Sequence, residues 1–349
     1  MMVNFCKFTI KTTPKNYSMQ RQQQLTLWLQ SQFPDEIFTL APASADASFR
    51  RYFRASFKDR TLIVMDAPPG HEDCRPFLQI AALFEQAGVH VPHVYAADLE
   101  QGFLLLSDLG NTTYLQALTT ENARKLYADA VDALIKIQLA STPEVLPPYD
   151  EALLLRELRL FPEWYINQHL GVTLTAVQNE KLETVFARIV ANNLAQPRVY
   201  VHRDYHSRNL MLCNANPGII DFQDAVYGPI TYDLASLFKD AYIKWDEEEI
   251  IDHLIGYWQK ARKVGLPVNE DFGQFYWDYE WVGVQRHIKV LGIFARLCHR
   301  DGKDGYLKDM PLVLAYLRAA AARYVDLKPL FNLLNELEPP QEAPTGYGF

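Results

Sequence analysis

The residues best suited to chemistry lie in the stretch VHRDYHSRNLML, residues 201–212. His202, Asp204 and Asn209 follow the spacing H-x-D-x-x-x-x-N, and Asp221 follows in GIIDF, twelve residues after Asn209. A carboxylate such as Asp204 accepts or orients the proton of an attacking hydroxyl. An amide oxygen and a second carboxylate, here Asn209 and Asp221, are ligands that hold Mg²⁺ against phosphate oxygens. This spacing therefore predicts phosphoryl transfer.

The turn NANPG, residues 214–218, separates Asn209 from Asp221. Asn, Pro and Gly are typical of turns, so we expect two short strands around it that place both metal-binding oxygens on one side. Asp204, on the loop before them, would face the nucleophile. His202 and His206 are predicted to support this loop rather than to react.

Two other interpretations of this cluster stay open from the residues alone. The polar side chains could simply satisfy one another in a buried loop. Alternatively, His202, Asp204 and His206 alternate along the chain, so on a strand they would face one way and could bind the metal of a hydrolase. Arg203 and Arg208 lie among them and disfavour a second cation.

Composition excludes several classes of function. The chain has 349 residues and a formal net charge of −8, with no basic block, so an electrostatic nucleic-acid binder is disfavoured. No apolar run reaches membrane-spanning length. The four cysteines are scattered and form no C-x-x-C pair, which fits a reducing compartment. We therefore expect a cytoplasmic protein without nucleic-acid or membrane partners, as a monomer or a weak dimer.

The periodicity predicts strands first and helices later. A helix is expected at residues 20–33, strands at 37–42, 49–57 and 61–65, a helix at 72–88, and two strands within 90–110 around a turn at 100–102. Helices are expected at residues 119–139 and 150–170 and again after residue 230. The predicted fold class is α+β, with a small antiparallel β-lobe that carries one helix and a larger, mainly helical lobe.

Composition shifts also suggest domain boundaries. Residues 1–19 are predicted to be a flexible N-terminal extension, because they are basic and lack a continuous apolar core. The β-lobe is predicted at residues 20–107, and the helical lobe, with the catalytic hairpin and a substrate pocket, at 108–338. The tail at residues 339–349 is rich in Pro and Gly and is expected to be loose.

The stretch VHRDYHSRNLML…GIIDFQDAVYGPITYDLASL resembles the aminoglycoside phosphotransferase and choline kinase family, relatives of the protein kinases. The resemblance extends over roughly residues 39–337 and implies a protein-kinase-like two-lobed fold and an ATP- and Mg²⁺-dependent small-molecule kinase. More narrowly, SADASFRRYFR, VMDAPPGHEDCRPF, LRLFPEWY and QRHIKVLGIFARLCHRDGK are similar to bacterial kinases of cell-wall recycling. Those kinases phosphorylate the anomeric hydroxyl of N-acetylmuramate and N-acetylglucosamine, which implies a small-molecule sugar substrate here.

The resemblance assigns roles to individual residues. Asp204 would orient or deprotonate the sugar hydroxyl, Asn209 and Asp221 would hold Mg²⁺, and Asp233 would brace the catalytic loop, as would His202. Contacts to ATP are implied for a phosphate-covering loop and a hinge, namely Ser44, Ala45, Asp46, Ala47, Ser48, Arg51, Leu106 and Asp108. Contacts to the sugar are expected from Trp164, Arg208, Arg286 and Lys289, the last two as possible partners of a muramic acid carboxylate.

One departure from the wider kinase pattern stands out. The third strand of such folds carries a Lys that grips phosphates and pairs with a helix Glu, whereas Met65 lies at about that place here. Glu72 would then lack its partner, and Arg50, Arg51 and Arg54 are the nearest replacement cations. The missing Lys motivates one alternative, a catalytically weak nucleotide-binding pseudokinase. A kinase for another hydroxyl substrate, an aminoglycoside or a choline-like alcohol, is the other.

Overall fold

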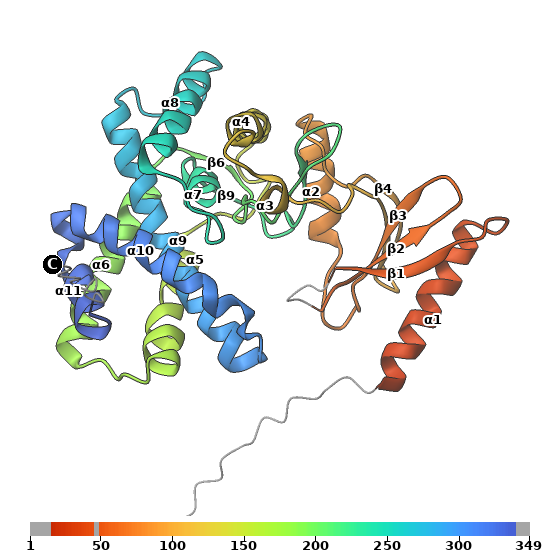
Figure 1. Cartoon of the computed structure of the whole chain (residues 1–349), viewed down its shortest axis with the longest axis horizontal. Helices are drawn as coiled ribbons and strands as arrows, with labels where there is room; N and C mark the ends of the chain where they lie inside the picture. The colour runs from red at the N-terminus through yellow and green to blue at the C-terminus, as the bar shows by residue number, and fades with distance from the viewer. Residues whose placement is uncertain (1–14, 45–48, 340–349) are drawn as a thin grey trace, which may run out of the picture. The chain divides into compact units, whose positions relative to one another are not determined.

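The computed structural model describes residues 15–44 and 49–339, and the chain divides into two compact units (Figure 1). Within the described range, unit 1 extends to Leu78 and resumes at His93–Asp108, while unit 2 comprises Gln79–Pro92 and the residues from Leu109 on. A five-stranded antiparallel sheet in unit 1 and a mainly helical unit 2 confirm the predicted α+β class, with a small antiparallel β-lobe and a larger helical lobe. The exact lobe boundaries stay a prediction.

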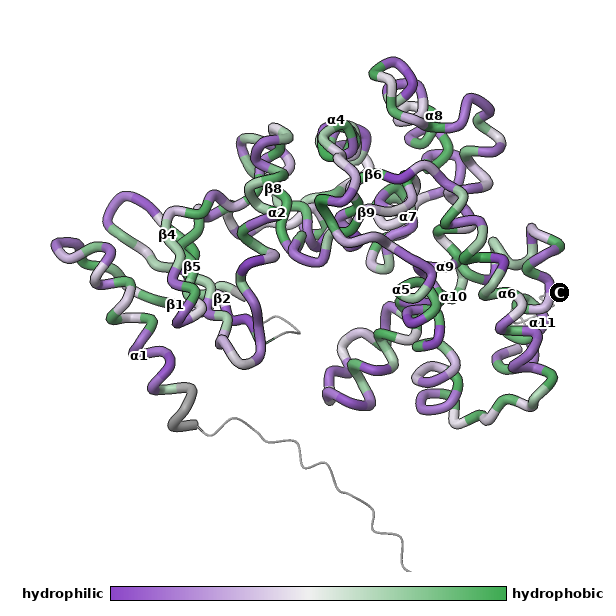
Figure 2. Tube along the Cα trace, turned by 180° about the vertical axis from the view of Figure 1, so that it is seen from behind, coloured by the Kyte–Doolittle hydropathy of each residue, from purple (hydrophilic) through white to green (hydrophobic). Residues whose placement is uncertain are grey.

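Unit 1 is a sheet backed by a helix. Its elements are α1 (Lys15–Gln32), β1 (Thr39–Ser44), β2 (Arg51–Ser56), β3 (Thr61–Asp66), β4 (Val94–Asp98) and β5 (Phe103–Ser107), with strand order β1-β2-β3-β5-β4. Leu25 and Leu29, one turn apart on α1, pack with Phe53, Val64 and Leu105 of the sheet in one apolar cluster. The apolar runs that form it can be followed in Figure 2. Burial of this cluster supplies the unit with its hydrophobic core.

The first helix begins earlier than the sequence pattern indicated. It starts at Lys15, so residues 15–19 of the expected extension are helical. The stretch from Lys15 to Phe33 contains no Gly or Pro, so nothing in it interrupts a helix. Similarly, α2 (Arg75–Gln86) begins three residues after the predicted start, and it is divided between the two units at Leu78.

Unit 2 is built from helices around two small strand pairs. Its helices are α3 (Tyr114–Ala117), α4 (Ala123–Leu139), α5 (Glu151–Leu158), the π-helix η1 (Phe161–His169), α6 (Ala176–Ala195), α7 (Tyr232–Phe238), α8 (Glu247–Lys263), α9 (Phe272–Asp301), the 3₁₀ turns η2 (Asp304–Asp309) and η3 (Val325–Leu327), α10 (Met310–Arg323) and α11 (Lys328–Leu337). Its strands are β6 (Arg198–Val201), β7 (Leu210–Met211), β8 (Gly218–Ile219) and β9 (Val226–Pro229). No helix in the described part of the chain is both long and apolar enough to cross a membrane.

The two strand pairs lie on either side of the loop that contains His202, Asp204 and Asn209. β6 pairs with β9, and β7 pairs with β8 through Leu210 opposite Ile219 and Met211 opposite Gly218. The NANPG turn thus closes a short hairpin, as the turn residues predicted. Residues 202–209, which connect β6 to β7, are called the catalytic loop below.

The long helix α9 passes beside this loop and carries buried polar side chains. Its N-terminus is capped by Asp271, and it ends at Gly302, whose φ of +68° is the left-handed conformation that favours glycine at a helix end. At Gly292 the helix packs closely against Leu160. A Cβ atom at position 292 would come within 2.6 Å of Leu160, so a larger residue would not fit without a shift. The buried charged residues of α9 include Glu280, Arg286 and Lys289, and each therefore needs a partner inside the protein.

Candidate active site

Asp233 at the start of α7 holds the beginning of the catalytic loop. Its two carboxylate oxygens accept hydrogen bonds from the backbone N–H groups of His202, at 2.7 Å, and Arg203, at 3.0 Å. Burial raises the pKa of Asp233 to about 7, while these two donors favour its charged form. The contacts are those expected of a brace, the role predicted for Asp233.

His202 uses both ring nitrogens within the protein. Nε2–H donates to the carbonyl of Ile220 at 3.0 Å, and Nδ1 accepts from the backbone N–H of Asp204 at 3.3 Å. Burial lowers the pKa of His202 to about 4, so its imidazole is neutral at physiological pH. With no ring nitrogen left over, His202 is poorly placed to ligate zinc, which weakens the metal-hydrolase interpretation.

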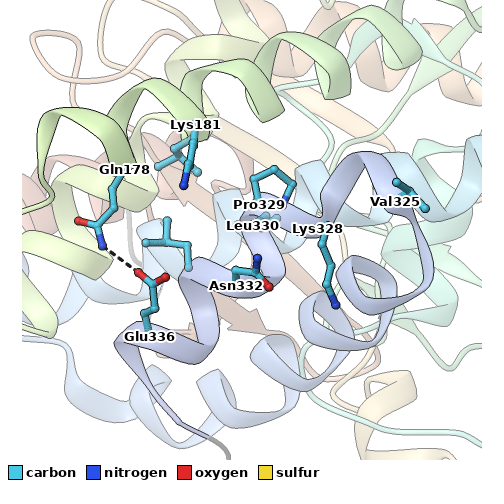
Figure 3. Close-up of a pocket in the computed structure, with 10 residues that line it drawn as sticks. Gln178, Lys181, Val325, Lys328, Pro329, Leu330, Asn332 and Glu336 are labelled. Atoms are coloured by element: carbon cyan, nitrogen blue, oxygen red, sulfur yellow. Dashed lines mark hydrogen bonds between the residues drawn. The ribbon is translucent and has the colours of Figure 1, made fainter.

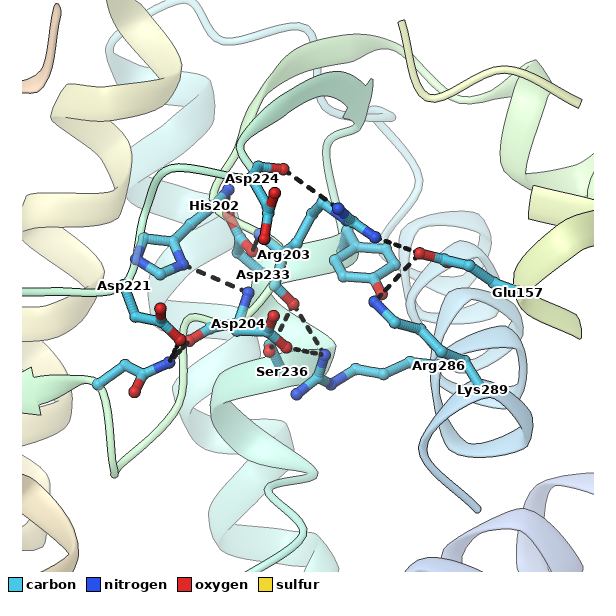
Figure 4. Close-up of polar contacts among 12 residues, drawn as sticks. Glu157, His202, Arg203, Asp204, Asp221, Asp224, Asp233, Ser236, Arg286 and Lys289 are labelled. Atoms are coloured by element: carbon cyan, nitrogen blue, oxygen red, sulfur yellow. Dashed lines mark hydrogen bonds and ion pairs between the residues drawn. The ribbon is translucent and has the colours of Figure 1, made fainter. Parts of the chain in front are cut away.

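Asp204 presents a partly exposed carboxylate between cations. Its side chain is 41% exposed, and Oδ1 lies 3.3 Å from Nη1 of Arg286 (Figure 4). Removal from water would by itself raise the pKa of Asp204, but the neighbouring Lys289 and Arg286 hold that pKa well below its ordinary value. Asp204 is therefore ionised and able to accept a hydrogen bond from a substrate hydroxyl.

Asn209 and Asp221 lie side by side, although twelve residues separate them. Nδ2 of Asn209 donates to the carbonyl of Asp204 at 3.0 Å and to Oδ2 of Asp221 at 3.2 Å. Gln223 donates to the other carboxylate oxygen of Asp221 at 2.8 Å. Because the amide nitrogen of Asn209 is engaged with the protein, its Oδ1 is the atom left to face a cation.

This donor set fits Mg²⁺ better than zinc. Asn209 and Asp221 offer one carboxamide and one carboxylate, and Mg²⁺ is commonly held by one or two such protein oxygens together with substrate phosphates and water. Within residues 15–44 and 49–339, no group of three or more His, Cys, Asp or Glu side chains is arranged to hold a metal. The assignment of these two residues to Mg²⁺ stays a prediction.

Asp221 of this set and Arg203, the residue before Asp204, have left-handed backbones. Arg203 has φ of +77° and Asp221 has φ of +64°, although neither is glycine. Such a conformation costs on the order of 1–3 kcal/mol and persists only where surrounding contacts impose it. Residues of this kind are typical of functional sites, and here one precedes Asp204 and the other is a predicted metal ligand.

The residues predicted to contact ATP belong to unit 1 and are only partly described. Ala45, Asp46, Ala47 and Ser48 lie outside the described residues, and Ser44 ends β1. Leu106 is buried in β5, opposite Ile63 of β3. Asp108 and Arg51 have carboxylate–guanidinium partners: Arg54 donates to both oxygens of Asp108, at 2.5 and 2.9 Å, and Arg51 donates to Asp66. Their nucleotide contacts stay a prediction.

A buried apolar side chain occupies the position on β3 where the lysine was expected. Met65 is 0% exposed, and its cross-strand neighbours are Tyr52 and Leu104. Glu72, which precedes α2 rather than opening it, forms an ion pair with Arg50 at 3.0 Å. Glu72 therefore does have a cationic partner. It is Arg50, one of the three arginines considered as replacements for the lysine.

The residues predicted to contact the sugar fall into two groups. Arg286 and Lys289 are 3% and 4% exposed and make their contacts within the protein. Trp164 is half-buried on η1, whereas the Arg208 side chain is 35% exposed. The finding for Arg286 and Lys289 favours a role other than direct substrate contact.

The structure also contains a buried acid that the sequence pattern did not single out. Glu157 of α5 accepts a hydrogen bond from Gln285 at 3.0 Å and from Tyr149, and it pairs with Arg203 and Lys289. The one signal in the sequence was an acid placed between Leu154 and Leu158 on the apolar face of a predicted helix.

A shallow pocket lies elsewhere in unit 2, between α6 and α11 (Figure 3). Its volume is about 350 Å³, and Lys181, Lys328 and Glu336 are among its lining residues. None of the predicted site residues lines it.

Comparison with known proteins identifies related chains. The model of the phosphotransferase enzyme family matches residues 39–265. The chain is 51% identical to an N-acetylmuramate/N-acetylglucosamine kinase of Pseudomonas aeruginosa, over 93% of this chain and 98% of the relative. It is 50% identical to a protein of the same description from Neisseria meningitidis serogroup B, over 95% of this chain and 100% of the relative.

Two solved structures show the same fold at low identity. A choline/ethanolamine kinase family protein from Mesorhizobium loti matches with a TM-score of 0.63 and 14% identity, over 90% of this chain and 99% of that one. The ADP-bound aminoglycoside phosphotransferase APH(2'')-Ib matches with a TM-score of 0.53 and 16% identity, over 84% and 97%.

Proposed function

Because this chain belongs to the phosphotransferase enzyme family, we propose that it transfers the γ-phosphoryl group of ATP to the anomeric hydroxyl of N-acetylmuramate and N-acetylglucosamine. The predicted class, a small-molecule kinase of this family, is confirmed. The observation that carries the choice of sugar is identity of 50% and 51% to kinases of that description across essentially their whole length. We also propose that the enzyme works in the cytoplasm, as a monomer or a weak dimer.

The catalytic loop supplies groups suited to this reaction. Phosphoryl transfer needs little covalent help and depends on positioning and on neutralisation of phosphate charge. The ionised Asp204 would accept the hydrogen bond of the anomeric hydroxyl and orient its oxygen toward the γ-phosphorus. Asn209 and Asp221 would hold Mg²⁺, which when bound neutralises charge on the phosphate oxygens.

A phosphate-transfer assay tests the proposed function. The purified chain is incubated with γ-labelled ATP and Mg²⁺ against a panel containing the two N-acetyl sugars, an aminoglycoside and choline. Label is expected on the two sugars alone, with NMR placing the phosphate on C1. Transfer to choline or to the aminoglycoside but to neither sugar would overturn the choice of substrate. Stabilisation by Mg-ATP without transfer to any acceptor would support the pseudokinase alternative.

Within the proposed function, we propose that Arg208 meets the lactyl carboxylate of N-acetylmuramate. Its guanidinium stacks on Tyr242, 3.6 Å from the ring centroid, and lies 3.6 Å from Oδ2 of Asp309, beyond hydrogen-bond distance. Arg208 makes no hydrogen bond through its side chain to any residue that the structure describes. The guanidinium is therefore pre-oriented, while its donors stay available for a bidentate carboxylate contact.

Replacement of Arg208 is expected to separate the two sugars. Arg208→Met should lower kcat/KM for N-acetylmuramate by about 10- to 100-fold, the range for a lost hydrogen bond to a charged group. N-acetylglucosamine has no carboxylate, so its kcat/KM should change by less than about threefold on the same reasoning. Steady-state kinetics with both sugars measures this ratio, and Arg198→Met, at an exposed position of β6, is the control. Equal losses for both sugars would contradict the assignment.

A further inference from the structure

Arg286 and Lys289 present two buried positive charges on one face of α9. They are three residues apart on the helix and are 3% and 4% exposed. A buried cation is strongly unfavourable unless anions and hydrogen-bond acceptors surround it. The partners of these two side chains therefore indicate what they do, and both chains of contacts lead to the catalytic loop (Figure 4).

Arg286 contacts the catalytic loop at two successive residues. Its Nη1 donates to the backbone carbonyl of Arg203 at 2.8 Å and lies 3.3 Å from Oδ1 of Asp204. The guanidinium of Arg286 thus contacts both the peptide group between Arg203 and Asp204 and the side-chain carboxylate of Asp204.

Arg203 precedes Asp204 and is one of the two residues that Asp233 holds. Its φ of +77° is strained for a residue other than glycine. Its N–H donates to Asp233, its carbonyl accepts from Arg286 and from the Ser236 hydroxyl at 3.4 Å, and its guanidinium pairs with Glu157. The backbone is therefore gripped on both sides of the strained residue. Loss of the Arg286 contact would leave the carbonyl only the longer hydrogen bond from Ser236 and let this peptide relax, which would move Asp204.

Lys289 acts on the same loop through Glu157. Its Nζ lies 3.3 Å from Oε1 of Glu157, the acid that also binds the guanidinium of Arg203. Burial would raise the pKa of Glu157, but Lys289 and Arg203 outweigh it and lower that pKa, so Glu157 is ionised. Lys289 thus keeps Glu157 charged and able to hold Arg203.

We propose that Arg286 is a positioning residue for phosphoryl transfer, which holds the carboxylate of Asp204 in place, and that Lys289 supports it through Glu157 and Arg203. This proposal rests on the proposed function, and it replaces the expectation that these two cations contact the sugar. Arg286 contacts the carboxylate of Asp204, and its side chain is only 3% exposed.

Arg286→Gln is expected to lower kcat by about 100-fold, the loss typical of a catalytic group displaced by about 1 Å. KM for the sugar and for ATP should change by less than about threefold, because no ground-state contact is removed.

Three further variants separate positioning from a general loss of structure. Arg286→Lys keeps the charge and should recover part of the lost kcat, and added guanidinium should partly rescue Arg286→Ala. Arg318→Gln is the matched control, because Arg318 also donates to backbone carbonyls, those of Leu334 and Glu338, away from the catalytic loop. It should lower the thermal midpoint while kcat stays within about threefold of the unaltered enzyme.

The outcomes decide between the roles. A rise in KM for the sugar with kcat unchanged would show that Arg286 binds substrate and would overturn the proposal. Equal kcat losses in Arg286→Gln and Arg318→Gln, without guanidinium rescue, would also overturn it. The proposed function fails separately, if the unaltered enzyme phosphorylates neither N-acetyl sugar. The Arg286 series is then measured with whichever acceptor the panel identifies.

Discussion

Asp204→Asn is expected to abolish phosphoryl transfer and to leave binding of Mg-ATP nearly unchanged. The amide has almost the same shape as the carboxylate, but it is neutral and cannot take up the hydroxyl proton. General acid–base groups contribute about 10²- to 10⁴-fold, so kcat should fall by at least about 10³-fold. Label transfer to N-acetylglucosamine measures the loss, and titration calorimetry measures ATP affinity.

The design of this test follows from the contacts of Asp204. The backbone N–H of Asp204 donates to His202 and its carbonyl accepts from Asn209, and neither contact involves the side chain that is replaced. The loop should therefore keep its shape in the variant. Asp132→Asn, an exchange of the same chemistry at an exposed residue of α4, serves as control. Near-normal turnover of Asp204→Asn would remove Asp204 from the reaction.

Asp221→Asn is expected to weaken Mg²⁺ binding and to lower turnover by about 10²-fold or more, since metal neutralisation of phosphate charge is worth several kcal/mol. The exchange removes the negative charge of the predicted metal site. Initial rates measured across a Mg²⁺ titration should show a higher half-saturating concentration, and a Mn²⁺ titration, read by electron paramagnetic resonance, reports metal affinity without turnover.

The matched control for this exchange is three residues away in the same segment. Asp224 has an exposed side chain, and only its backbone carbonyl accepts from Arg203. Asp224→Asn should therefore leave the Mg²⁺ dependence as it is. If Asp221→Asn and Asp224→Asn behave alike, with unaltered Mg²⁺ dependence, Asp221 does not hold the metal.

The residues of the catalytic loop could be predicted from the sequence because they lie close together along the chain. His202, Asp204 and Asn209 lie within eight residues of sequence. A single hairpin turn separates Asn209 from Asp221, so these two residues are also close along the chain. The apolar strands and amphipathic helices were readable for the same reason, since periodicity is a property of neighbouring residues. Boundaries were less accurate, as at α1, because periodicity marks the apolar face of a helix and not the residue at which the helix starts.

The cations could not be assigned by such reasoning. Arg50, Arg51 and Arg54 are nearly equivalent in the sequence, yet in the folded chain their carboxylate partners are Glu72, Asp66 and Asp108. Sheet register decides among them, because it places Arg51 opposite Asp66 and Arg54 opposite Ile63. A shift by one residue would exchange the faces of Arg51 and Arg54.

The sequence by itself determined the type of chemistry and the fold class, because both depend on short spacings and on periodicity. Only the tertiary structure decided which charges serve the reaction and which serve the scaffold. Arg286 and Asp204 are 82 residues apart along the chain, and Lys289 and Glu157 meet across a still longer separation. Such pairs form because burial forces each charge to find an opposite one, and that requirement acts through space and leaves no local pattern.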